Sequence, residues 1–181
     1  MAGSTFIALL RGINVGGRNR VPMPELREIC GELGWGGVAT YVNSGNVVFT
    51  ADATAAALES ALERAIEARF RLAIPVIVRT SREWSTYLRS NPFPAASERE
   101  GNAVMLALSK AKPGRDAAKV LEERATFGER IARTGDAIWI HFARGVGKSK
   151  LSPGLIDRAV GSPTTMRNWR TVVALGEMVR R

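Results

Sequence analysis

Four short segments of the sequence combine glycine with arginine, lysine or asparagine, which are residue types that bind anions. The first, residues 11–20 (RGINVGGRNR), follows an apolar run and precedes a helical pattern. Its glycines allow close approach of the backbone to a ligand, and N–H groups before a helix can hold an anion. The alternative is a strand-to-helix connection that needs glycine for its turns, although ten residues is long for one. The candidate ligand residues here are Arg11, Asn14, Gly16, Gly17 and Arg18.

The second segment, residues 145–150 (GVGKSK), ends like a Walker A loop. Phe142 stands where the first glycine of G-x-x-x-x-G-K-[ST] belongs, and the preceding residues predict a hairpin, so a P-loop is not expected. A basic, glycine-rich anion site around Lys148 is the functional interpretation. An ordinary surface loop is the structural one.

The third segment is residues 164–171 (TTMRNWRT). Thr165 is predicted to cap the last helix, which places Arg167 and Asn168 in the first turn, where positive charge opposes the helix dipole. Either a bound anion or a salt bridge to a carboxylate accounts for such a cation.

The fourth segment, residues 41–46 (YVNSGN), reads as a tight hairpin turn between two β-branched runs. Turn geometry explains Asn43, Ser44 and Asn46 by default, and a ligand role for them is the alternative.

The sequence has few residues that could serve as nucleophiles, as their general bases or as metal ligands. The chain has one histidine, His141, and one cysteine, Cys30, which lies on the apolar stripe of a predicted helix. A triad would have to use His141, and no metal or cofactor site is predicted. Whether the protein is an enzyme stays open, because catalysis by arginine, lysine or backbone groups is compatible with the sequence.

The charge is strongly positive and unevenly distributed. The net charge is +9, and residues 91–181 carry 16 basic and 9 acidic side chains against 10 and 8 in residues 1–90. A basic half suggests nucleic acid or another anionic partner. Because 21 of the 26 basic residues are arginine, a general compositional bias is the alternative explanation.

Composition and length indicate a globular cytoplasmic protein. The 181 residues are 45% hydrophobic and 24% charged, which is ordinary for a folded chain. The longest apolar run, residues 103–108, is far shorter than the roughly 20 residues of a membrane span. Residues 6–10 are too short for the core of a signal peptide. No membrane partner is expected.

The apolar patterns predict two domains with the same order of elements. In the first, strands at 5–10, 38–42, 46–50 and 74–79 alternate with helices that begin at Pro24 and at Asp52 or Thr54. This βαββαβ order is typical of the ferredoxin-like (α-β plait) fold. The second has strands at 102–109, 128–133 and 137–142, and helices beginning at Pro113, Ser152 and about Met166. Residues 1–90 and 102–181 are the predicted domains, joined by a linker at 91–101.

Four motifs resemble those of one bacterial family. They are residues 9–17 (LLRGINVGG), 40–49 (TYVNSGNVVF), 147–151 (GKSKL) and 165–172 (TMRNWRTV), in that order. The chain is thereby similar to the domain of unknown function 1697 family. The resemblance implies an α+β protein of two tandem ferredoxin-like domains, with antiparallel sheets and helices on one face, and it implies no activity. The family motifs fall on Arg11, Gly12, Asn14, Gly16, Gly17, Ser44, Gly45, Asn46, Lys148, Arg167, Asn168 and Trp169.

The sequence therefore favours an anion- or phosphate-binding module whose ligand is nucleic acid or a nucleotide. The first strand lacks the stacking aromatics of RNA-recognition motifs, so phosphate contact fits better than base recognition. The alternatives are a small-molecule enzyme acting on a phosphorylated or carboxylated substrate in an interdomain cleft, and a module that pairs through a sheet edge. The sequence does not specify the ligand or the oligomeric state.

Overall fold

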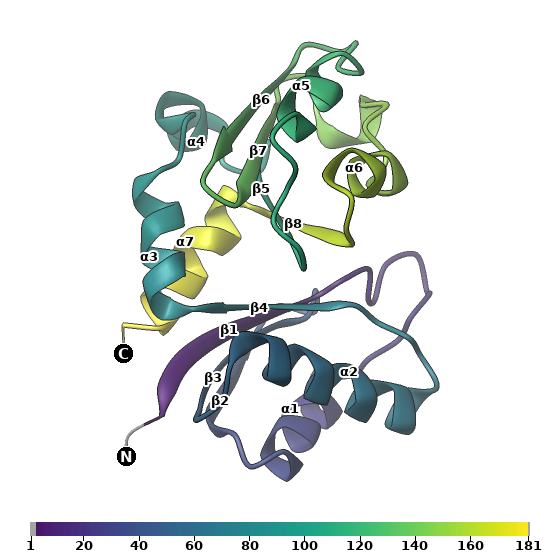
Figure 1. Ribbon diagram of the computed structural model, residues 1–181, viewed down its shortest axis with the longest axis vertical. Coiled ribbons are helices and arrows are strands. Elements are labelled where there is room, and N and C mark those ends of the chain that lie inside the picture. The colour runs from purple at the N-terminus through teal and green to yellow at the C-terminus, as the bar shows by residue number, and fades with distance from the viewer. Residues whose placement is uncertain (1–2, 181) are drawn as a thin grey trace. The chain divides into compact units, whose positions relative to one another are not determined.

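Two units, each built on its own sheet, make up the computed structural model, which describes residues 3–180 (Figure 1). The first unit contains the residues up to Ser85 together with the segment from Leu175, and the second contains Thr86–Ala174. Two helices, α3 (Ser81–Arg89) and α7 (Trp169–Met178), are therefore divided between the units. The outer ends of the expected domains, residues 1–2 and 181, lie outside the described residues.

The first unit is a four-stranded antiparallel sheet with two helices on one face. Its elements are β1 (Ser4–Leu10), α1 (Met23–Glu32), β2 (Gly36–Tyr41), β3 (Asn46–Ala51), α2 (Ala55–Phe70) and β4 (Val76–Thr80), and its strand order is β2-β3-β1-β4. Phe6, Ala8 and Leu10 pack with the helices. Ile7 and Leu9 point to the other face and are also buried, which explains the uninterrupted apolar run of β1.

The second unit repeats this order of elements. After α4 (Pro94–Glu100) come β5 (Val104–Ser109), α5 (Ala117–Glu122), β6 (Glu129–Thr134), β7 (Ala137–Phe142), a 3-10 turn (Val146–Lys148), α6 (Pro153–Val160) and β8 (Thr164–Asn168). The strand order is β6-β7-β5-β8, again antiparallel. Leu121 of α5 and Ile156 of α6 pack in one core with Ile131 and Ile140 of the sheet, so both helices cover the same face.

Several helix ends follow the local sequence rules. Thr54 and Ser152 each accept a hydrogen bond from the backbone N–H three residues later, at 3.3 Å, as N-caps do. Thr80 and Glu83 form a reciprocal capping box at the start of α3. Gly161 ends α6 in the left-handed conformation, with φ +80°. The predicted helix starts at Thr54 and Ser152 are confirmed.

The predicted start of the last helix is wrong. Residues 164–168 form the edge strand β8, whose register pairs Leu106 with Arg167 and Leu108 with Thr165, and α7 begins at Trp169. Pairing with β5 provides the backbone hydrogen bonds that a helix would otherwise supply, so Arg167 and Asn168 lie on a strand. Asn168, not Thr165, caps α7, because its Oδ1 accepts the Thr171 N–H at 2.9 Å.

Two smaller differences concern the connections. Helix α5 begins at Ala117, four residues after the predicted start at Pro113. Residues 91–101, which we expected to form a linker, contain helix α4. There the side chain of Asn91 donates to Ser97 Oγ at 2.8 Å and accepts from the Phe93 N–H at 2.9 Å, which holds the start of α4.

Candidate anion-binding sites

The glycine-rich loop of the first unit is organised around one side chain, Asn14. Its Nδ2 donates to the carbonyl oxygens of Val21 at 2.9 Å and Asn43 at 2.8 Å, and its Oδ1 accepts the Val21 N–H at 2.9 Å. Both amide hydrogens and the oxygen of Asn14 are thus engaged within the chain. Asn14 thereby joins the first candidate segment to the fourth.

The hairpin turn 42–46 has a structural explanation of its own. Asn46 is fully buried, and its Nδ2 donates to the Tyr41 carbonyl at 3.0 Å and to Ser44 Oγ at 2.9 Å. Gly45 is buried with φ +76°, and a Cβ there would lie 2.6 Å from Leu10 Cβ. The spacing of Ser44, Gly45 and Asn46 is therefore what this turn needs in order to pack on β1.

The tip of the glycine-rich loop is exposed. Gly16 and Gly17 turn the chain at φ +57° and +75°, next to Val15, whose side chain is 67% exposed. Arg18 is exposed beside them, and Arg11 is half-buried. Of the first candidate segment, Gly16, Gly17 and Arg18 are accessible to a ligand.

Asn14 should contribute to stability through its hydrogen bonds. We expect Asn14→Gly to lower the free energy of unfolding by about 2 kcal/mol, because the Val21 N–H and two carbonyls lose their partner. Glycine is the suitable replacement since Asn14 has φ +54°, which alanine disfavours. Urea unfolding measures the difference. Unchanged stability in Asn14→Gly would contradict this role.

The basic loop of the second unit, residues 143–150, is anchored at one point. Ser149 Oγ donates to Glu129 Oε1 and also accepts the Leu151 N–H at 3.1 Å. Burial acts to raise the pKa of Glu129, but hydrogen bonds from Ser149 and from backbone N–H groups outweigh it and lower the pKa. Glu129 therefore remains a carboxylate and holds the loop, while Arg144, Lys148 and Lys150 are exposed.

Arg167 is buried, and its side chain forms hydrogen bonds within the edge strand β8. Its Nη1 donates to Thr165 Oγ1 at 2.8 Å and to the Met166 carbonyl at 2.9 Å, and burial lowers its pKa to about 10. Met166 packs toward the helices, as does Leu151 beyond the basic loop. Because neighbouring strand residues point to opposite faces, Arg167 faces away from that loop, and the structure does not bring Arg167 and Lys148 together.

The first unit contains a matching arrangement at its own edge strand. Arg79 Nη1 donates to the Val78 carbonyl at 2.9 Å, and Glu59 accepts the Val78 N–H at 2.9 Å. In the second unit Asp157 of α6 accepts the Thr164 N–H at 2.9 Å. In both β4 and β8, an arginine and a helix carboxylate thus bond backbone groups of the strand, which protects these two edges from pairing with another chain.

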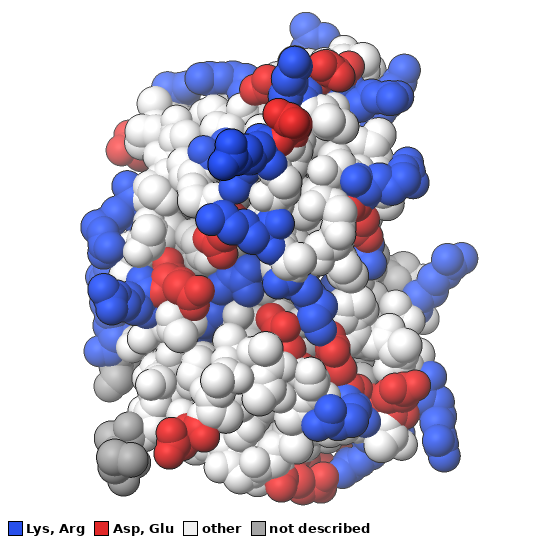
Figure 2. Space-filling view, in the orientation of Figure 1, with Lys and Arg blue, Asp and Glu red and all other residues white. Residues whose placement is uncertain are grey.

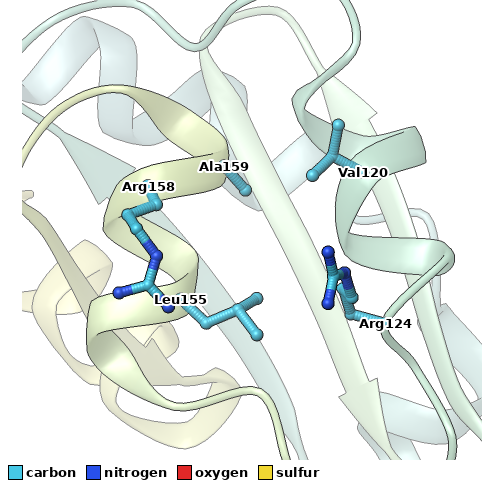
Figure 3. Close-up of a pocket in the computed structure, with 5 residues that line it drawn as sticks. All are labelled: Val120, Arg124, Leu155, Arg158 and Ala159. Atoms are coloured by element: carbon cyan, nitrogen blue, oxygen red, sulfur yellow. The ribbon is translucent and has the colours of Figure 1, made fainter.

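One site was missed by the sequence analysis. A pocket of about 190 Å³ lies between α5 and α6, lined by Val120, Arg124, Leu155, Arg158 and Ala159 (Figure 3). Helical spacing places Leu155, Arg158 and Ala159 on one face of α6, but it does not show that this face meets α5.

The residues that could bind a metal or react as a thiol are the acidic side chains, His141 and Cys30. No group of three histidine, cysteine or acidic side chains there could hold a metal ion. His141 Nε2 lies 3.0 Å from Glu100 Oε1. Burial raises the pKa of the Cys30 thiol to about 12, which makes it unreactive. No helix within residues 3–180 is both long enough and apolar enough to span a membrane.

Comparison with known families gives a match that covers the first two motifs. A family described as "Protein of unknown function (DUF1697)" matches residues 4–139. The chain belongs to the DUF1697 family. The matched range contains the glycine-rich loop and the hairpin turn, and it ends before the basic loop and β8.

A solved structure of similar fold accompanies this family assignment. The DUF1697 chain resembles the conserved bacterial protein SP0830 from Streptococcus pneumoniae, with 24% identity, a TM-score of 0.75, and coverage of 97% of this chain and 98% of that one. The likeness covers both units and concerns the fold. No curated protein matches the chain.

Proposed function

We propose that this DUF1697 protein is an anion-binding module that recognises the phosphate backbone of nucleic acid through its basic loop, residues 143–150. The observation that carries the proposal is local charge: the loop exposes Arg144, Lys148 and Lys150, and the sequence has no carboxylate between Asp136 and Asp157. Clustered, exposed cations are the usual sequence-independent contacts to phosphates. A cytoplasmic location, where nucleic acid is available, belongs to the same proposal.

The surroundings of the loop support a polyanionic partner. Arg144 lies beside Gly128, in the turn before β6. A Cβ added at Gly128 would be 3.9 Å from the Nε atom of Arg144. The same turn carries Phe127, whose side chain is 36% exposed and could stack on a base. Figure 2 shows Lys and Arg side chains projecting from the second unit, with acidic groups between them.

We also propose that each unit is a ferredoxin-like plait. Support comes from the βαββαβ order of elements and from the strand orders β2-β3-β1-β4 and β6-β7-β5-β8, all with antiparallel neighbours. Such a fold hosts many functions, so the proposed activity depends on the loop and not on the fold.

Salt dependence tests the phosphate contact. Three phosphate contacts to a single strand predict a slope of log affinity against log salt of about −2, which is roughly a 15- to 20-fold loss between 50 and 200 mM salt. Fluorescence anisotropy of a labelled single-stranded oligonucleotide measures it. We expect the triple variant Arg144→Gln, Lys148→Gln, Lys150→Gln to lose this slope and most of the affinity.

A matched control variant separates the effect of the loop cations from the effect of total net charge. Arg27→Gln, Arg64→Gln and Arg71→Gln remove three exposed cations from the first unit, so the change in total charge is the same. This control should bind much as the native chain does. Equal losses in the two triple variants, or no binding by the native protein at 50 mM salt, would overturn the proposal.

A further inference from the structure

The pocket between α5 and α6 combines an apolar wall with two arginines. Val120 of α5 and Leu155 and Ala159 of α6 supply the apolar surface. Arg124, in the turn after α5, and Arg158 of α6 come from opposite sides of the pocket (Figure 3). All five residues belong to the second unit, so the pocket is formed within one compact body.

The two guanidinium groups have no carboxylate partner within residues 3–180. Asp157, the sequence neighbour of Arg158, points to β8 and accepts the Thr164 N–H at 2.9 Å. Each guanidinium can therefore donate charge-assisted hydrogen bonds to an anion bound in the pocket.

We propose that this pocket binds a small organic anion, with a phosphate or carboxylate head between Arg124 and Arg158 and a short apolar body against Val120, Leu155 and Ala159. The volume of about 190 Å³ lies below the roughly 300–1,000 Å³ of drug-sized sites, so a single ring with one anionic group is the expected size. The site is separate from the basic loop and does not depend on the proposed nucleic-acid function.

Nuclear magnetic resonance titration of the full-length, ¹⁵N-labelled protein tests the site directly. The probes are phenyl phosphate, benzoate and inorganic phosphate. We expect phenyl phosphate to shift the amide signals of Val120, Leu155 and Ala159, and to bind several-fold more tightly than inorganic phosphate, because the ring buries apolar surface. Benzoate distinguishes the two head groups: equal binding indicates a site for any small organic anion, and weaker binding indicates a phosphate ester.

Variants separate the contribution of charge from that of the cavity. Arg124→Gln and Arg158→Gln should each lower the affinity for phenyl phosphate by about three- to tenfold, as expected for a charged contact at an exposed rim. Ala159→Phe fills the pocket without changing the charge and should abolish binding. Arg115→Gln removes an exposed cation of the same unit outside the pocket and should have no effect.

The results also distinguish this proposal from the nucleic-acid one. The triple variant of the basic loop should keep its affinity for phenyl phosphate, even if it no longer binds the oligonucleotide. The proposal is overturned if neither organic anion shifts the pocket amides, if inorganic phosphate binds as tightly as phenyl phosphate, or if Ala159→Phe binds as the native chain does while retaining native chemical shifts elsewhere.

Discussion

Arg167→Ala should lower the free energy of unfolding by about 3–5 kcal/mol, within the range for truncating a large buried side chain to alanine. The side chain is 7% exposed, and its truncation leaves a cavity beside β5 together with two acceptors, Thr165 Oγ1 and the Met166 carbonyl, that lose their donor. Urea unfolding followed by circular dichroism measures the loss. Arg115→Ala, at an exposed position, provides the comparison and should change stability by less than about 0.5 kcal/mol.

Arg167→Met separates the effect of the lost volume from that of the lost charge and hydrogen bonds. Burial lowers the pKa of Arg167 to about 10, so the fold disfavours the charged form, and methionine removes that penalty while keeping most of the volume. We therefore expect a smaller loss than for alanine. Between the folded pKa and the higher unfolded pKa the unfolded chain binds more protons. The stability of the native protein should consequently rise relative to Arg167→Met as the pH increases above about 10.

The same variants test the sequence-based view of Arg167 as a ligand. A buried side chain should leave oligonucleotide affinity unchanged in Arg167→Met. A variant that keeps native stability but loses binding would contradict the structural role and restore the ligand role.

The error at β8 shows what local patterns omit. Thr164–Asn168 is a short edge strand, and its identity depends on β5, which lies far away in the sequence. Its free backbone groups are satisfied by Asp157 and Arg167, and neither contact is visible in a helical or alternating pattern. Long, apolar β1 needed no such information, because its composition alone indicates a strand buried on both faces.

Comparison of the two halves of the chain would have corrected that error. In β4, Val78, Arg79 and Thr80 are followed directly by α3, and Thr80 caps that helix. In β8, Met166, Arg167 and Asn168 occupy the corresponding positions before α7, and Asn168 is the cap. The pattern of apolar residue, arginine, cap and helix thus marks the last strand of each unit.

The candidate site could be predicted only in part. The glycine-rich loop and the hairpin turn were each recognised from local composition, but the bond from Asn14 to the Asn43 carbonyl spans 29 residues and could not be inferred from either segment. Exposure of Lys148 agrees with its position in a glycine-rich loop. The α5–α6 pocket required knowledge of which helix faces meet, which periodicity alone does not provide.

Gly45→Ala should strongly destabilise the first unit, with an expected loss of about 3–5 kcal/mol. The new Cβ would lie 2.6 Å from Leu10 Cβ and 2.8 Å from Ile13 Cδ1, and Leu10 belongs to a paired strand that cannot move freely. The left-handed φ of +76° adds roughly 1–2 kcal/mol for any residue with a Cβ.

Gly12→Ala separates these two causes. Gly12 has nearly the same conformation, with φ +63°, and a Cβ there would meet nothing within 4 Å. Its loss should therefore be limited to the conformational part, about 1–2 kcal/mol, and the difference between the two variants measures the steric cost of filling the space between the turn and β1. Urea midpoints at a constant m value give both numbers. Equal losses at the two glycines would show that the turn can move away from β1, in which case the packing of Gly45 against Leu10 would not explain why this motif has glycine there.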